Sequence, residues 1–204
     1  MSTLTDTPST SQPTWIRGLI WIVETTRVTP NALTVMGFFT VVGVAALIVA
    51  EWWWAAGFVF IGATLADSLD GTLARYQGTS SKFGAFLDST LDRAADGVLF
   101  GAFAIVFAMR DEPVMVGVTI AALVAAFITS YARARADGIG IHGADAGLME
   151  RTERIILMGP AVFMGGLDYI PEAVLTALAV LSIYTAIVRL NSIRRALANT
   201  GENP

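Results

Sequence analysis

The fold class of this chain is decided by residues 32–50, which read ALTVMGFFTVVGVAALIVA. These nineteen residues carry no charge, and a helix of that length can cross the hydrocarbon core of a bilayer. Trp52, Trp53 and Trp54 follow almost at once, and indole rings collect at the boundary between membrane and water. The stretch therefore predicts a transmembrane helix that ends next to an aromatic interface.

Further apolar runs extend this pattern along the chain. They cover residues 52–66, 97–109, 113–132, 155–167 and 173–188. Several of these runs are too short to span a bilayer unless the polar residues beside them continue the same helix. We therefore predict an all-α integral membrane protein with six transmembrane helices.

The composition agrees with a membrane protein. Of the 204 residues, 54% are hydrophobic and only 15% are charged, whereas a soluble domain carries about a quarter charged residues. The formal net charge of −4 gives no basic surface for a nucleic-acid partner. The chain lacks Cys and has a single histidine, His142, which excludes disulfides, thiolate nucleophiles and zinc sites built from several Cys or His.

Two segments precede the first predicted span. Residues 1–13 are rich in Ser, Thr and Pro and predict a disordered tail. Residues 15–23, WIRGLIWIV, are too short to span and carry two Trp, so they predict a short helix on the membrane surface or a lead-in to the first span. We expect residues 14–200 to form a single domain.

The basic residues predict the orientation. With six spans, twelve of the thirteen Lys and Arg residues fall on one side of the membrane, and Arg110 alone falls on the other. The positive-inside rule makes the basic side cytoplasmic. Both termini are then predicted to be cytoplasmic.

Four aspartates lie where the second span ends and the third begins. Asp67 and Asp70 are spaced i, i+3, and Asp88 and Asp92 are spaced i, i+4. Each pair projects from one face of a helix. A short Gly/Ser/Thr loop joins the two helices, so we expect them to be antiparallel neighbours. The four carboxylates are thus predicted to meet at the cytoplasmic end.

Clustered carboxylates repel one another, and ionisable groups at membrane depth are usually functional. A divalent cation offsets that repulsion, and oxygen ligands without Cys or His favour Mg²⁺, Mn²⁺ or Ca²⁺ over zinc. Four Asp are enough to hold two ions, an arrangement that suits phosphoryl displacement. Gly71 and Gly84 leave space beside the acids, and Arg75 can hold phosphate oxygens.

The spacing D-x2-D-G-x2-A-R-x8-G-x3-D-x3-D over residues 67–92 resembles the signature of the CDP-alcohol phosphotransferases. Members of that family transfer a phosphatidyl-type group from a CDP-linked lipid to an alcohol and release CMP. The resemblance implies CDP-diacylglycerol as the lipid substrate and two Mg²⁺ ions, or Mn²⁺, as cofactors. It implies a homodimer, and it implies Asp92 as the base that takes the acceptor hydroxyl proton. The ligands that it implies for the ions are Asp67, Asp70, Asp88 and Asp92.

The same resemblance implies a site for the CDP-lipid. Residues 30–34, PNALT, look like the family segment that opens the first span near the nucleotide. The residues implied to bind the CDP-lipid are Asn31, Thr34, Gly71, Arg75 and Ser81.

Arginines close to three predicted helix ends point to an acceptor that carries its own phosphate. Several guanidinium groups can stabilise one dianion through charge-assisted hydrogen bonds, and a neutral alcohol would not need them. The residues predicted to bind the acceptor phosphate are Ser130, Arg133, Arg151, Arg154 and Arg189.

Two local segments favour one acceptor. Residues 130–137, SYARARAD, and residues 150–154, ERTER, resemble segments of the phosphatidylinositol phosphate synthases of actinobacterial type, although Arg133 stands where that group has Lys. The resemblance implies inositol 1-phosphate as acceptor and phosphatidylinositol phosphate as product. Glycerol 3-phosphate is the second candidate, as in phosphatidylglycerophosphate synthases, which have Pro where this chain has Ser89. A cation transporter is the alternative from a different class, since intramembrane acids also mark ion paths.

Overall fold

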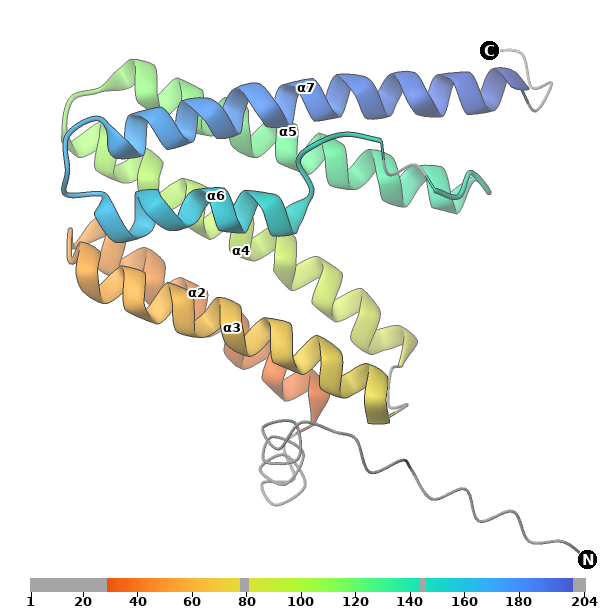
Figure 1. Ribbon diagram of the computed structural model, residues 1–204, viewed down its shortest axis with the longest axis horizontal. Coiled ribbons are helices and arrows are strands. Elements are labelled where there is room, and N and C mark those ends of the chain that lie inside the picture. Colours follow the sequence, from red (N-terminus) through yellow and green to blue (C-terminus); the bar gives the residue numbers. More distant parts are fainter. Residues whose placement is uncertain (1–28, 78–80, 144–145, 200–204) are drawn as a thin grey trace, which may run out of the picture.

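The computed structural model describes residues 29–77, 81–143 and 146–199, with the side chains of all of these except Pro30 and residues 66–77. In this part the chain forms helices and no strand (Figure 1). The predicted all-α fold is therefore confirmed, whereas the predicted tail (1–13) and surface helix (15–23) lie outside the described residues. The helices are α2 (Pro30–Val49), α3 (Trp53–Gln77), α4 (Lys82–Met109), α5 (Pro113–Gly138), α6 (Arg151–Met164) and α7 (Ile170–Asn199).

Local sequence explains where the helices begin. The Thr29 hydroxyl accepts a hydrogen bond from the Ala32 N–H at 3.3 Å. Pro30 occupies the first turn of α2, where a backbone N–H would have no acceptor within the helix, so its missing N–H costs nothing. The Ser81 hydroxyl caps α4 in the same way by accepting from the Gly84 N–H at 2.9 Å. Because α4 starts at Lys82, the polar segment before the apolar run is helical, as predicted.

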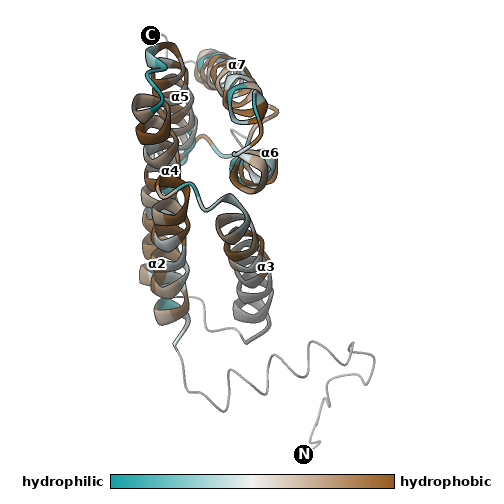
Figure 2. Cartoon of the chain, turned by 90° about the vertical axis from the view of Figure 1, so that its left-hand side faces the viewer, coloured by the Kyte–Doolittle hydropathy of each residue, from teal (hydrophilic) through white to brown (hydrophobic). Residues whose placement is uncertain are grey.

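The helices form a ring in which each packs against two others, in the order α2, α4, α5, α7, α6 and α3. Figure 2 shows this ring as two layers, with α2, α4 and α5 in one layer and α3, α6 and α7 in the other. In the described part, α2 packs between α3 and α4, although we expected those two sequence neighbours to pack directly on each other.

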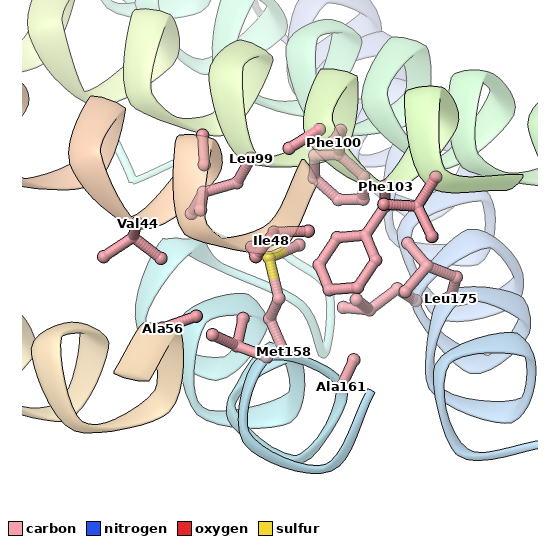
Figure 3. Close-up of a cluster of buried hydrophobic side chains, with 14 of the residues drawn as sticks. Val44, Ile48, Ala56, Leu99, Phe100, Phe103, Met158, Ala161 and Leu175 are labelled. Atoms are coloured by element: carbon pink, nitrogen blue, oxygen red, sulfur yellow. The ribbon is translucent and has the colours of Figure 1, made fainter. Parts of the chain in front are cut away.

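The apolar core fills one half of the ring. Ile48 of α2, Phe103 of α4 and Leu175 of α7 are fully buried and meet Met158 of α6 (Figure 3). Ile48, Phe103 and Leu175 lie in the halves of their helices that adjoin the α2–α3, α4–α5 and α6–α7 connections. These connections are on the left in Figure 1. The other half of the ring holds buried charges in place of this apolar packing.

The α2–α3, α4–α5 and α6–α7 connections are tied together by one arginine. Arg110 forms a 2.8 Å ion pair with Glu51, lies 5.5 Å from the ring centre of Trp53 and donates to the Gly165 carbonyl at 3.4 Å. This is the basic residue that the charge pattern separated from the other twelve. The contacts confirm that the three connections share one end of the bundle.

The outer surface is apolar. Phe39, Phe58, Ile120 and Ile183 are among the large hydrophobic side chains that are exposed, which suits contact with lipid. Among the described residues, three helical segments are long and apolar enough to cross a membrane, namely 31–49, 113–138 and 170–199, and a shorter apolar helix covers 53–65. The count of six spans stays a prediction.

Candidate active site

Three aspartates of α4 lie on one face at successive turns. Asp88 is exposed, the Asp92 side chain is 18% exposed, and Asp96 is buried. The spacing of four residues places them one above another along the helix. A line of carboxylates therefore runs from the exposed start of α4 into the interior of the ring.

Helix α6 is short, and this brings its first turn to the carboxylates. It has 14 residues, whereas the other described helices have 20 or more. After α5 the chain turns back, and α6 begins near the middle of the bundle (Figure 1). Glu153 stabilises this start by accepting a hydrogen bond from the Glu150 N–H at 3.0 Å. The positive end of α6 thus lies within the ring.

Two ion pairs cross the ring between α6 and α4. Arg151 pairs with Asp92 at 2.9 Å, and one turn further along both helices Arg154 pairs with Asp96 at 2.9 Å. The outer pair is partly exposed, with 30% of the Arg151 side chain accessible. The inner pair is buried, with 4% of the Arg154 side chain and 9% of the Asp96 side chain accessible.

Arg189 of α7 holds the entry to α6. Its Nη2 donates to Glu150 at 3.0 Å, its Nη1 to the Thr129 carbonyl at 3.3 Å and its Nε to the Ala146 carbonyl at 3.2 Å. The Arg189 side chain is 3% exposed, so it joins α5, α7 and the segment before α6 from within the bundle. Arg133 of α5 reaches the same Glu150 carboxylate from the exposed side at 3.5 Å.

The start of α2 approaches the start of α4. A Cβ placed at Gly84 would lie 3.0 Å from Asn31 Oδ1 and 3.1 Å from Ser81 Oγ. Gly84 therefore lets the Asn31 amide and the Ser81 hydroxyl come together one turn before Asp88. These polar groups and the carboxylates occupy the same end of the ring.

Comparison with known proteins shows which family this chain belongs to. The family model described as CDP-alcohol phosphatidyltransferase matches residues 27–188, which cover all the helices above except the end of α7. The chain belongs to the CDP-alcohol phosphatidyltransferases. The predicted family and enzyme class are confirmed.

Two of the similar sequences carry the same description. The phosphatidylinositol phosphate synthase of Corynebacterium glutamicum is 41% identical over 170 residues, which cover 80% of this chain and 77% of that protein. The phosphatidylinositol phosphate synthase of Streptomyces avermitilis is 36% identical over 182 residues, covering 84% of this chain and 74% of that protein.

Solved structures agree in fold. The phosphatidylinositol phosphate synthase of Mycobacterium tuberculosis with CDP-DAG bound has a TM-score of 0.73 and 33% identity, and the match covers 88% of this chain and 91% of that chain. The same protein in complex with manganese and citrate has a TM-score of 0.75 and 32% identity, with coverage of 88% and 87%. This phosphatidyltransferase is thus a multi-pass membrane protein of the same architecture.

Two of the four signature aspartates, Asp88 and Asp92, have described side chains. α3 is helical to Gln77, so Asp67 and Asp70 lie on a helix at the predicted i, i+3 spacing. The side chains of Asp67, Asp70 and Arg75, and the surroundings of Gly71, lie outside the described part. Of the other residues predicted to bind substrates, Thr34 and Ser130 are partly buried and Arg133 is exposed.

The donor chemistry of the described residues fits a divalent cation. Asp88 and Asp92 supply carboxylate oxygens one turn apart on α4, the type of ligand that Mg²⁺ and Mn²⁺ prefer. Among the side chains that the structure describes, no three acidic or histidine groups form a metal-holding cluster. Two of the four predicted ligands, Asp67 and Asp70, lie outside that part, so the complete ligand set stays a prediction.

Two acids of this phosphatidyltransferase were not predicted as site residues. The first is Asp96, which the structure makes the partner of Arg154. Glu150, which joins Arg133 and Arg189, had no assigned role. The available signals were the continued four-residue spacing from Asp88 to Asp96 and the Glu150-x-x-Glu153 pattern at a helix start.

Gly147→Ala should lower both thermal stability and activity. Gly147 has φ +136°, and a Cβ there would lie 2.2 Å from Thr185 Cγ2. The Thr185 hydroxyl accepts hydrogen bonds from the Leu148 and Met149 N–H groups at 3.3 and 3.1 Å, so moving Thr185 displaces the segment that leads into α6. We expect a loss of about 1–3 kcal/mol, measured by thermal or denaturant unfolding in detergent.

Gly143→Ala is the matched control for this substitution. Gly143 also has a positive φ, +77°, but open space surrounds its Cβ position. It therefore reports backbone strain without the clash. Equal stability and activity for the two variants would show that packing of Gly147 on Thr185 is unimportant.

Proposed function

We propose that this chain is a phosphatidylinositol phosphate synthase, which transfers the phosphatidyl group of CDP-diacylglycerol to inositol 1-phosphate. The single observation that carries the proposal is the 2.9 Å contact between Asp92 and Arg151. It places an acid that can take a hydroxyl proton beside a cation that can hold the phosphate of the same acceptor. The names of the similar proteins support the same substrates.

The signature carboxylates bind the divalent cations in this proposal. Asp67 and Asp70 of α3 and Asp88 and Asp92 of α4 would hold two ions, Mg²⁺ or Mn²⁺, and a relative has been solved in complex with manganese. When bound, the ions neutralise charge on the pyrophosphate oxygens. Asn31 and Ser81, with Thr34, Gly71 and Arg75, bind and orient the CDP part of the lipid.

Asp92 acts on the acceptor. Its carboxylate takes the proton of the acceptor hydroxyl, and the alcohol oxygen forms a bond to the phosphorus that bears the diacylglycerol. The bond from that phosphorus to the bridging oxygen breaks, and CMP leaves with that oxygen. Arg151, held against Asp92, fixes the acceptor so that the hydroxyl faces the carboxylate.

We assign direct contact with the acceptor phosphate to Ser130, Arg133 and Arg151, because these side chains are at least partly accessible. Arg154 and Arg189 were predicted as ligands of the same phosphate. In the structure their guanidinium groups are buried and hold Asp96 and Glu150. Their direct contact with the acceptor therefore stays a prediction, and the kinetic tests below address it for Arg154.

The orientation and assembly complete the proposal. The site lies at the end of the bundle opposite Arg110, and the charge pattern makes this end cytoplasmic. Both termini are then cytoplasmic as well. We also propose a homodimer, as the family resemblance implies.

Release of CMP from CDP-diacylglycerol by the purified protein tests the function. We expect rapid release with inositol 1-phosphate and release at least about 10-fold slower with free inositol, because the phosphate supplies charge-assisted contacts. Product analysis should show phosphatidylinositol phosphate. Equal rates with free inositol would contradict the proposed anion site.

Glycerol 3-phosphate is the decisive comparison. Faster turnover with it would keep the anion site but assign the chain to phosphatidylglycerophosphate synthesis. No CMP release with any alcohol, together with cation flux into vesicles, would instead support the transporter alternative, which membership of an enzyme family argues against.

A further inference from the structure

The inner ion pair between Asp96 and Arg154 has no task in the reaction as proposed. The two side chains are buried, they are 2.9 Å apart, and they lie one helical turn deeper than Asp92 and Arg151. Asp96 is outside the family signature spacing, which ends at Asp92. The pair therefore needs an explanation separate from metal and substrate binding.

Stability alone does not explain the pair. Removing two charges from water costs about as much as their attraction returns, and apolar side chains of similar volume often stabilise a core equally well. The hydrogen bonding is also incomplete, because Arg154 Nε is buried without a hydrogen-bond partner in the described part. The phenylalanine-rich core on the same helix shows that apolar packing is available to this ring. What an ion pair adds is a defined position for each partner.

The ion pair can define the position of α6 relative to α4. The ring packs α6 on α3 and α7, so its register against α4 depends on side chains that reach across the interior. Arg151 and Arg154 are three residues apart on α6, and Asp92 and Asp96 are four apart on α4. Two contacts one turn apart fix both the height and the rotation of the first turn of α6, whereas a single contact leaves the rotation open.

We propose that Asp96 and Arg154 are positioning residues, which hold the first turn of α6 so that Arg151 meets Asp92 in the geometry needed for transfer. Neither residue touches the substrates in this role. The inference rests on the proposed function for its kinetic readout, whereas its structural readout is independent of activity. It also gives Arg154 a different task from the predicted contact with the acceptor phosphate.

The test replaces the pair by apolar residues. Asp96→Leu combined with Arg154→Met removes both buried charges together, so no unpaired charge is left in the core. We expect a folded protein whose turnover number falls by about 10–100-fold, because a displacement of about 1 Å in a reacting group can cost that much. The KM for CDP-diacylglycerol should stay unchanged. Asp96→Asn alone, which keeps the shape of the side chain, should lower turnover in the same direction.

A distance measurement provides the structural readout. The chain contains no Cys, so spin labels can be attached at single introduced cysteines. Phe86 on α4 and Ile156 on α6 are exposed over 63% and 67% of their surface, respectively. We expect one narrow distance distribution for the labelled parent and a shifted or broadened one for the apolar double variant.

The matched control is the ion pair at the opposite end. Glu51→Gln with Arg110→Met removes a 2.8 Å pair between two other elements and should change neither turnover nor the label distance. Parent-like turnover and distance in the Asp96→Leu, Arg154→Met variant would overturn the proposal. So would a rise in acceptor KM for Arg154→Met with no effect of Asp96→Asn, which would make Arg154 an acceptor ligand.

Two further outcomes of the experiment also have a defined interpretation. If the double variant does not fold, Asp96→Asn in the labelled protein takes its place, and a parent-like distance in it overturns the proposal. If the parent protein fails to use inositol 1-phosphate, the proposed function is lost, but the label distance still tests whether the pair positions α6.

Discussion

Asp92→Asn is expected to lower the turnover number by about 10²–10⁴-fold, the contribution typical of a positioned general base. An amide cannot take the proton of the acceptor hydroxyl, and a sugar hydroxyl is a weak nucleophile while it keeps that proton. The substitution also weakens the 2.9 Å contact with Arg151 and removes a predicted metal ligand. Steady-state CMP release measures the loss, and binding of CDP-diacylglycerol should remain measurable.

Asp111→Asn is the matched control for the same chemical change. Asp111 lies in the α4–α5 connection at the opposite end and has φ 56°, a conformation that Asn tolerates well. It should leave turnover unchanged. Activity of Asp92→Asn near the parent level at neutral pH would remove Asp92 from the role of base and point to another acid of the signature.

The elements of the fold could be predicted from local sequence. An uncharged run such as 32–50 is most stable in the hydrocarbon core of a bilayer, where a single segment must form a helix to satisfy its backbone hydrogen bonds. The run therefore predicts α2 to within two residues of its described bounds, Pro30–Val49. The polar lead-in to residues 97–109 was expected to be helical, and α4 does begin at Lys82. The ring order could not be predicted, because packing depends on side-chain shape between segments far apart in the chain.

The candidate site was predictable in chemistry but not in pairing. The spacing of Asp88 and Asp92 on one helix is a local property, and the family signature adds Asp67 and Asp70. The partners of the arginines are non-local: Arg154 is 58 residues from Asp96, and Arg189 is 39 residues from Glu150. The sequence shows only that these arginines share a charge and one end of the bundle, and it does not show which acid each of them pairs with.

Burial divides those arginines into two kinds. A cationic side chain near a helix end is usually exposed, and Arg133 follows that rule. Arg154 and Arg189 do not, because the short α6 and the returning segment before it cover them. The length of α6 is therefore the feature that separates the arginines into two layers, with accessible cations outside and buried, paired ones beneath.

Removal of divalent cations is expected to abolish turnover, and Mg²⁺ or Mn²⁺ should restore it. The described carboxylates of α4 carry like charges one turn apart, and a metal offsets their repulsion while it neutralises the pyrophosphate. Dialysis against EDTA followed by titration with each metal gives the measurement. Full activity in excess EDTA would contradict a metal-dependent reaction.

Asp88→Ala sharpens this test, because Asp88 is exposed and no ion pair in the described part depends on it. Loss of an outer partner of a metal ligand commonly costs about 10–100-fold in metal affinity, so loss of a direct ligand should raise the Mg²⁺ requirement by at least that much. Asp168→Ala, an exposed acid in the α6–α7 connection at the opposite end, should leave the metal titration unchanged. If both variants titrate like the parent, Asp88 is not a ligand, and the ions must be held by Asp67, Asp70 and Asp92 without it.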